Sequence, residues 1–292
     1  MLNLDSHFSW SEWSKLEDCV TGGPIPPQPG LYRIRRVGRA ELDYIGQSGQ
    51  GGMHLRKRLA MLKGVYGLEM PYRDPHTAGP GLWALLREGA RFEVSFACVE
   101  GSTSWRKGME ALAIALYRQD HRQSPSLNFG RMPGGYAISS QRNAKLRGGP
   151  TVDELDCHHP SIPPAGPLTG TPDAPDWSGH RWSAWEALPT AIWRTDAAVT
   201  GLYRIRAKDD PSLLYVGQGV ISARLRQHLR KATASDDAQG RIFRAADSLE
   251  VSWVANRDWR QNQRLELEND LIAAHVLVRE APPPAQFIGR SL

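Results

Sequence analysis

One pattern occurs twice in this sequence, and it limits the folds that the chain can adopt. The first copy begins with Gly-Leu-Tyr-Arg-Ile-Arg at 30–35 and continues with Tyr-Ile-Gly-Gln at 44–47. The second copy begins with the same six residues at 201–206 and continues with Tyr-Val-Gly-Gln at 215–218. In each copy the second tyrosine follows the first by twelve positions. Intact spacing over this length indicates an internal duplication, so we predict two units of one fold.

The hydrophobic pattern inside each copy predicts an α+β unit. Residues 31–36, 42–45 and 92–96 have the composition and alternation of strands, and Leu55, Leu59 and Leu62 mark one face of a helix. Further helices are predicted near 81–86 and 105–122, and the second copy repeats this order up to a helix near 259–278. We therefore predict two tandem domains, each a three-stranded, mainly antiparallel sheet flanked by helices.

Charge and composition divide the chain into three segments. Residues 1–147 form the first predicted domain and residues 181–292 the second, and each begins with a leader that contains two tryptophans. Residues 148–180 are rich in Pro and Gly, and positions 151–180 contain five acidic residues and no Lys or Arg, so a linker is predicted. Within it, Cys157, His158 and His159 are adjacent, but no second pair of ligands lies nearby, so we do not assign them a metal.

The composition excludes some classes of protein and favours others. No apolar run approaches the roughly 20 residues of a membrane span, and three scattered cysteines fit a reducing compartment, so a cytoplasmic protein is expected. The chain carries 36 Lys and Arg against 31 Asp and Glu. Arginine outnumbers lysine 29 to 7, and its planar guanidinium suits phosphate. A polyanionic partner fits this balance.

A carboxylate and an amide recur at matched places near the end of each copy. Glu110 precedes Asn128 by eighteen residues, and Glu268 precedes Gln286 by the same distance. A carboxylate on an otherwise apolar helix is costly unless it is paired or binds a cation. Glu266 is a competing choice in the second copy, but only Glu268 preserves the spacing.

The ordered set of Gly-Leu-Tyr, Tyr-Ile/Val-Gly, Arg, Glu and amide resembles the GIY-YIG endonucleases. The resemblance covers most of each copy, but neither the linker nor the tryptophan leaders. It implies that the units hydrolyse phosphodiester bonds in DNA with a divalent metal, Mg²⁺ or Mn²⁺. It further implies that Glu110 and Glu268 bind the metal.

The resemblance also implies roles for the other matched residues. Tyr32 and Tyr203 match the first tyrosine of the family, and Tyr44 and Tyr215 match the second; one of the two helps to deprotonate the attacking water. Arg58 and Arg224 match the arginine that holds the scissile phosphate, although Arg56 competes with Arg58. Asn128 matches a supporting amide, where the second copy has Gln286. His228 matches a His or Tyr four residues after the arginine, where the first copy has Leu62.

Two function classes remain open at this point. We predict a DNA endonuclease of restriction, defence or repair type, acting on double-stranded DNA. The alternative is a DNA-binding or partner-binding protein in which one or both units have lost turnover. A monomer with two sites is compatible with the duplication, but the sequence does not specify the oligomeric state. The candidate DNA contacts are the polar and basic residues near the motifs, namely Gln47, Arg56, Lys57, His76, Gln218 and Arg226.

Overall fold

The computed structural model describes residues 3–151, 159–196, 198–208 and 210–288. It divides into two compact units. The first comprises Met1–Arg106 and Leu116–Ser161, and the second comprises Lys107–Ala115 and Ile162–Leu292. Each unit is described separately below.

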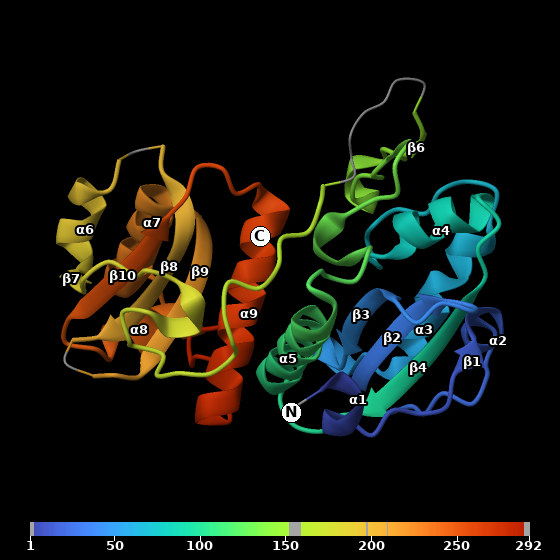
Figure 1. The fold of residues 1–292 in the computed structure, drawn as a ribbon, viewed down its shortest axis with the longest axis horizontal. Coiled ribbons are helices and arrows are strands. Elements are labelled where there is room, and N and C mark those ends of the chain that lie inside the picture. The colour runs from blue at the N-terminus through green and yellow to red at the C-terminus, as the bar shows by residue number, and fades with distance from the viewer. Residues whose placement is uncertain (1–2, 152–158, 197, 209, 289–292) are drawn as a thin grey trace. The chain divides into compact units, whose positions relative to one another are not determined.

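The helices and strands of the first part of the chain follow the predicted order. The predicted strands correspond to β2, β3 and β4, and the leucine-marked helix corresponds to α3 (Figure 1). In chain order the elements are α1 (Leu4–His7), β1 (Ser14–Lys15), α2 (Leu16–Val20), β2 (Gly30–Arg36), β3 (Leu42–Ser48), α3 (Leu55–Ala60), α4 (Gly79–Arg87), β4 (Phe92–Cys98), α5 (Thr103–His121), β5 (Tyr136–Ala137) and β6 (Gly149–Pro150).

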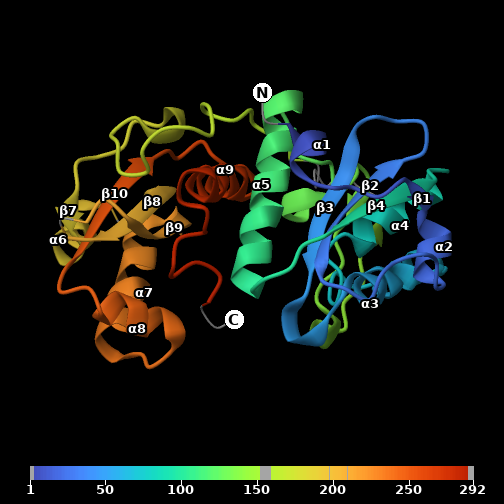
Figure 2. The ribbon, with the colours of Figure 1, turned by 90° about the horizontal axis from the view of Figure 1, so that it is seen from below.

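The second part of the chain repeats most of this order, with a longer helix directly after the second main strand, 14 residues in α7 against 6 in α3. In Figure 2, α7 and α8 lie together on one side of the sheet that contains β8 and β9. The elements are β7 (Glu186–Ala187), α6 (Leu188–Arg194), β8 (Thr200–Ala207), β9 (Leu213–Val220), α7 (Ile221–Ala234), α8 (Ala238–Arg244), β10 (Leu249–Ala255) and α9 (Gln261–Arg279).

The two main sheets are antiparallel and have four strands each, not the three that we predicted. Their strand orders correspond, β1-β4-β2-β3 and β7-β10-β8-β9. The additional strands are β1 and β7, which follow the tryptophan leaders and pair with β4 and β10 (Figure 1). They satisfy backbone groups at an otherwise open sheet edge. At two residues each, they are too short to show an alternating pattern in the sequence.

The two faces of each sheet have different chemistry because side chains alternate along β2 and β8. Tyr32 and Ile34 face one core, which also contains Leu55, Leu59 and Leu62. The intervening Arg33 and Arg35 stack on Trp13, with guanidinium carbons 4.7 and 3.9 Å from the ring centre. The second unit repeats this stack with Arg204 and Arg206 on Trp185, at 4.6 and 4.2 Å. The leader tryptophans therefore cover the outer face of each sheet.

The glycine of each Tyr-Ile/Val-Gly motif allows the two tyrosine rings to pack across its strand. A Cβ atom on Gly46 would lie 2.5 Å from the Tyr32 hydroxyl and 2.6 Å from a ring carbon of Tyr44. A Cβ atom on Gly217 would lie 2.4 Å from the Tyr203 hydroxyl. No side chain fits at either position without displacing the tyrosines.

The segment predicted as a linker makes specific contacts in its described parts. Arg204 donates from Nη1 to the carbonyl oxygens of Pro172 and Ala174, at 2.6 and 2.9 Å. Trp177 is buried and stacks on Trp182 with ring centres 6.1 Å apart. Cys157 and His158 lie outside the described residues. Among the described residues, no helix is long and apolar enough to cross a membrane.

Candidate active site

Two tyrosines and a histidine meet in the core-facing layer of the second unit. Tyr203 from β8 and Tyr215 from β9 lie with ring centres 6.1 Å apart. His228 from α7 places Nε2 2.8 Å from the Tyr203 hydroxyl, and its ring centre lies 4.7 Å from that of Tyr215. Phe243 from α8 packs edge-on against His228 at 5.4 Å and holds the imidazole in place. The three polar rings therefore form one buried cluster.

A guanidinium and a carboxylate complete this cluster. Arg224 precedes His228 by one helical turn on α7, so both side chains project from the same face of the helix. The charge of Tyr203, followed by those of Tyr215 and Glu268, raises the pKa of Arg224 despite the opposing effect of burial. Glu268 comes from α9, far along the chain. Four elements thus bring one arginine, one carboxylate, two phenols and one imidazole together.

Burial dominates the electrostatics of the second unit's cluster. It raises the pKa of Glu268 to about 7, although Arg224 acts in the opposite direction. It also raises the pKa of Tyr215 to about 12, with a further contribution from Glu268 that Arg224 opposes. Burial, assisted by Arg224, lowers the pKa of His228 to about 3. At neutral pH the imidazole is therefore uncharged and the phenol keeps its proton.

The first unit contains a matching group of rings. Tyr32 from β2 and Tyr44 from β3 lie with ring centres 6.0 Å apart. The third ring is His76, whose Nε2 lies 2.8 Å from the Tyr32 hydroxyl and whose centre lies 5.7 Å from that of Tyr44. Tyr32 is 0% exposed and His76 is 2% exposed. His76, which we listed as a candidate DNA contact, is therefore buried within the tyrosine cluster in this structure.

His76 occupies in space the place that His228 has in the second unit, but it comes from a different part of the chain. It lies in the loop before α4, and its Nδ1 accepts a hydrogen bond of 3.2 Å from the Ala78 amide. Leu62, at the sequence position that corresponds to His228, is fully buried in the hydrophobic core. Sequence spacing does not predict this replacement, because a loop, not a helix turn, carries the histidine to Tyr32.

The structure distinguishes between Arg56 and Arg58. Arg58 donates from Nη1 to the Pro75 carbonyl at 2.5 Å, next to His76. Burial, followed by the charge of Arg58, holds the pKa of His76 well below its ordinary value. Arg56 instead donates from Nε to the carbonyl of Ile25 at 2.8 Å. Arg58 is therefore the arginine that accompanies the tyrosine cluster.

The two amides have the same structural contact. The Asn128 side-chain oxygen accepts from the Ile45 amide at 2.9 Å, and its nitrogen donates to the Ile45 carbonyl at 2.8 Å. The Gln286 side-chain oxygen accepts from the Val216 amide at 3.1 Å. Each amide thus holds the backbone of the strand beside the second tyrosine. Gln286 reproduces the bond that the Asn128 oxygen accepts, despite its longer side chain.

The candidate metal-binding carboxylates occupy equivalent helix positions. Glu110 is the eighth residue of α5 (Thr103–His121), and Glu268 is the eighth residue of α9 (Gln261–Arg279). Lys107–Ala115 belongs to the second compact unit, so the equivalence of Glu110 rests on its position in sequence and helix. Glu266 is fully buried and accepts a hydrogen bond of 3.0 Å from the Ile162 amide. Glu266 therefore binds the backbone of the predicted linker at Ile162. Glu268, by contrast, lies close enough to Tyr203 and Tyr215 to affect their pKa values.

The remaining candidate DNA contacts lie in different settings. Lys57 on α3 and Arg226 on α7 are exposed. Gln47 is partly buried, whereas the Gln218 side-chain oxygen accepts from Arg264 Nε at 3.2 Å. Lys57 and Arg226 are therefore the two of these side chains that are open to a partner.

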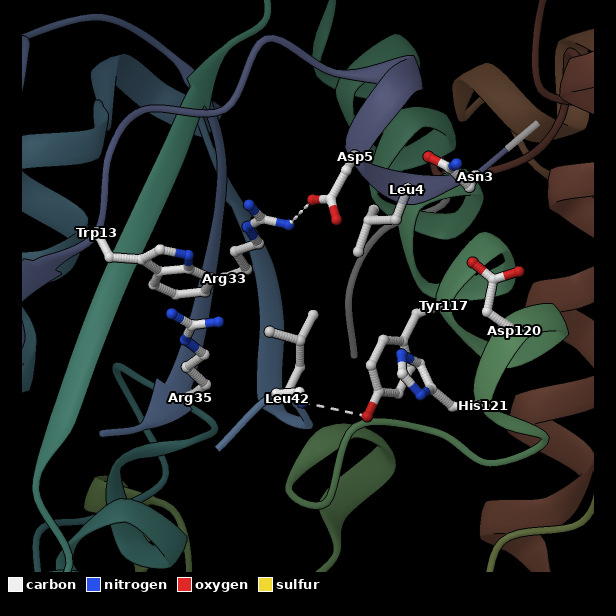
Figure 3. A pocket seen from close by; sticks show the side chains of 11 residues that line it. Asn3, Leu4, Asp5, Trp13, Arg33, Arg35, Leu42, Tyr117, Asp120 and His121 are labelled. Carbon is white, nitrogen blue, oxygen red and sulfur yellow. Dashed lines mark hydrogen bonds and ion pairs between the residues drawn. The ribbon is translucent and has the colours of Figure 1, made fainter. Parts of the chain in front are cut away.

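A pocket on the outer face of the first sheet is separate from the tyrosine cluster. Its lining includes Arg33, Arg35, Trp13, Asp5 and Tyr117 (Figure 3). Arg33 is paired with Asp5, and the Tyr117 hydroxyl accepts from the Leu42 amide at 3.1 Å. These two contacts are internal to the unit, and the lining also includes Asp120 and His121.

The described residues contain no group of three or more His, Cys, Asp or Glu side chains that could hold a metal. The candidate carboxylates are instead two single ones at matched helix positions, Glu110 on α5 and Glu268 on α9. In comparisons with known proteins, no family model, no curated protein and no solved structure matches the chain. The function is therefore argued from the residues and their geometry.

Proposed function

We propose that the protein is a divalent-metal-dependent DNA endonuclease that hydrolyses phosphodiester bonds in two units of GIY-YIG type. The observation that carries this proposal is the cluster of Tyr203, Tyr215, Arg224, His228 and Glu268, which four separate elements bring together. The first unit supports it with Tyr32, Tyr44, Arg58 and His76 in a corresponding arrangement.

Phosphodiester hydrolysis makes three demands that this cluster can meet. A bond must form between a water oxygen and phosphorus, the bond to the leaving oxygen must break, and the extra negative charge on the phosphate must be stabilised. Arg224 supplies a permanent positive charge with several N–H donors for non-bridging oxygens. Tyr203 and Tyr215 present hydroxyl groups that can position the water and take part in moving its proton.

The histidine positions one tyrosine in each unit. His228 is uncharged because burial lowers its pKa to about 3, so it holds Tyr203 through a neutral hydrogen bond of 2.8 Å. A charged imidazole at this place would compete with Arg224 for the phosphate. The neutral ring leaves the arginine as the cation of the cluster in this unit.

Glu268 fits a divalent cation. It is a carboxylate in a desolvated position, with a pKa raised to about 7, and a cation would relieve the cost of its charge. Mg²⁺ or Mn²⁺ bound there would supply Lewis acidity for the phosphate and the leaving oxygen. Glu110, at the matching position of α5, is the other carboxylate to which we assign a cation.

A nicking assay on supercoiled plasmid with Mg²⁺ tests the proposal. We expect Glu110→Ala and Glu268→Ala each to reduce nicking, and the double variant to lose at least about 100-fold of the rate, since both proposed cation ligands would be absent. The matched control is the double variant Glu88→Ala with Glu280→Ala, which removes the same charge from exposed positions. Nicking at the control's rate in the Glu110 and Glu268 double variant would rule out this nuclease mechanism.

The same assay distinguishes the endonuclease from the alternative function, a DNA-binding protein without turnover. A protein that binds DNA through degenerate units would retain affinity for a labelled duplex and would show no metal-dependent nicking in any variant. The restriction, defence and repair roles differ in the DNA that they cut, so the cleavage positions on defined duplexes would distinguish them.

A further inference from the structure

A hairpin in the first unit projects cations beside the loop that carries His76. It is built from β5 (Tyr136–Ala137) and β6 (Gly149–Pro150), which pair antiparallel. A hydrogen bond of 3.1 Å from the Ser140 amide to the Leu146 carbonyl supports the turn between them. A Cβ atom on Gly148 would lie only 2.1 Å from the Ala137 carbonyl oxygen, so the two chains pack closely. The hairpin therefore has a defined shape.

The hairpin is fastened to the segment that leads to His76. Ser139 is 1% exposed and donates from Oγ to the Pro71 carbonyl at 2.8 Å. Arg147 donates from Nη1 to the Met70 carbonyl at 2.6 Å and stacks over Tyr72 at 4.2 Å. The hairpin is thus anchored to residues 70–72, shortly before the loop that places His76 against Tyr32.

A groove of about 770 Å³ lies between the hairpin and this loop. Arg142 and Arg147 line it from the hairpin, and most of the other lining residues lie between Met61 and His76. The lining also includes two carboxylates, Glu69 and Asp74. Because His76 also holds Tyr32 at 2.8 Å, the groove adjoins the tyrosine cluster of this unit.

The charge on the hairpin is of one sign. Residues 121–152 contain five Arg and Lys and no Asp or Glu. Arg147 is engaged by Glu69, 3.3 Å away, and by the contacts above. Arg142 and Lys145 are exposed, and their side chains have no hydrogen-bond or ion-pair partner among the described residues. An exposed pair of unneutralised cations is suited to phosphate, which needs no sequence-specific contact.

We propose that the hairpin at 136–150 is a DNA-holding arm for duplex DNA that passes this groove toward Tyr32 and His76. Arg142, which lines the groove, and Lys145, which lies in the same turn of the hairpin outside the groove lining, bind its backbone phosphates. The inference rests on the proposed function, because it takes the tyrosine cluster to be the destination of the DNA. It adds a second contact surface to the first unit that lies outside the residues of the family motif.

The test is the salt dependence of DNA binding by the full chain. Binding of a fluorescent duplex is measured by anisotropy in EDTA, which prevents cleavage, at several salt concentrations. The variant Arg142→Ala with Lys145→Ala should weaken binding and lower the slope of log K against log salt by about two, since each phosphate contact contributes about 0.9. The matched control, Lys15→Ala with Arg39→Ala, removes two exposed cations from the same unit and should keep the wild-type slope.

Each outcome has a separate meaning. The proposed DNA-holding arm would be wrong if the salt slope were unchanged in the hairpin variant. It would also be wrong if the slope fell equally in the control variant. Binding of the wild type to RNA in preference to duplex DNA would overturn the partner that we assign. If the wild type binds duplex with the expected slope difference but never nicks plasmid, the nuclease proposal fails while the arm stands.

Discussion

The tyrosine clusters of the two units reach one arrangement by different routes. In the second unit the histidine lies one helical turn after Arg224, so the regular geometry of α7 carries both groups. In the first unit α3 is short, Leu62 fills the core, and His76 arrives on a loop 44 residues away from Tyr32. The hydrogen bond between tyrosine and histidine measures 2.8 Å in both units. The two units thus share the tyrosine–histidine hydrogen bond, although the histidine comes from a different position in each copy of the sequence.

The two histidines differ at their second ring nitrogen. His76 Nδ1 accepts from the Ala78 amide, so in the neutral ring the proton lies on Nε2 and is donated to Tyr32. His228 Nδ1 is buried with no hydrogen-bond partner among the described residues. A loop backbone can supply a free N–H to fix the tautomer, whereas the amides of a helix are already paired. We infer that the first unit fixes the direction of this hydrogen bond more firmly.

The strongest test of the comparison removes each histidine in turn. His76→Ala in the Glu268→Ala background and His228→Ala in the Glu110→Ala background should each lower plasmid nicking by about 100-fold, because a tyrosine loses the group that orients it. Initial rates at saturating Mg²⁺ measure the effect.

A histidine outside the cluster provides the control for this test. His7→Ala, in α1 of the first unit, removes a half-buried imidazole that packs against Phe8, and should leave the nicking rate within about twofold of the parent because this ring is outside the cluster. A large loss with His228→Ala and none with His76→Ala would show that the two histidines are not equivalent, and would break the comparison.

The next effect concerns pH in the second unit. The pKa of Glu268 is raised to about 7, and its protonated form cannot bind a cation. Mn²⁺ affinity of the Glu110→Ala chain, followed by electron paramagnetic resonance, should therefore fall about tenfold per unit as pH drops below about 7. An affinity that stays level down to pH 5 would contradict the raised pKa.

The same carboxyl group has a predictable effect on stability. Its pKa is higher in the folded unit than its ordinary value of 4.5, so folding favours the protonated form and stability falls as pH rises from 4.5 toward 7. Glu268→Gln should raise the unfolding free energy at pH 8 by on the order of 2 kcal/mol and should have little effect below pH 4.5. Urea unfolding at the two pH values measures the difference.

The smallest expected effect comes from the amides. Asn128→Ala and Gln286→Ala should each destabilise the protein by about 1–3 kcal/mol, because the amide of Ile45 or Val216 loses its buried partner. Exchanging the two types, Asn128→Gln with Gln286→Asn, should cost less than either alanine variant if reach alone distinguishes them. Urea unfolding monitored by fluorescence measures both. A greater loss of nicking than of stability would instead indicate a direct role in the chemistry.

Much of the site could be predicted from local patterns. Tyr32 and Tyr44 lie on adjacent strands of a short hairpin, so their proximity follows from strand pairing. Leu55, Leu59 and Leu62 follow the helical period and are all buried. Arg224 and His228 share a helix face for the same reason. These contacts are local, and backbone geometry alone brings the partners together.

The other features depend on contacts between distant segments. The fourth strand of each sheet is two residues long and exists because an edge of β4 or β10 offers unpaired backbone groups. His76 lies outside every repeated motif. Its loop belongs to the unit that has Leu62 in place of a histidine four residues after Arg58. The stretch at 121–152 contains no acidic residue, but only the fold shows that its hairpin lies beside that loop.

The sequence by itself determined the duplication, the tyrosine pairs, the glycines that admit them and the helix faces, since each depends on residues that are near neighbours along the chain. Only the tertiary structure decided which histidine completes the first cluster, which of Arg56 and Arg58 accompanies it, and what the amides bind. Those outcomes depend on how loops close over many residues, and loop closure is set by packing and not by periodicity.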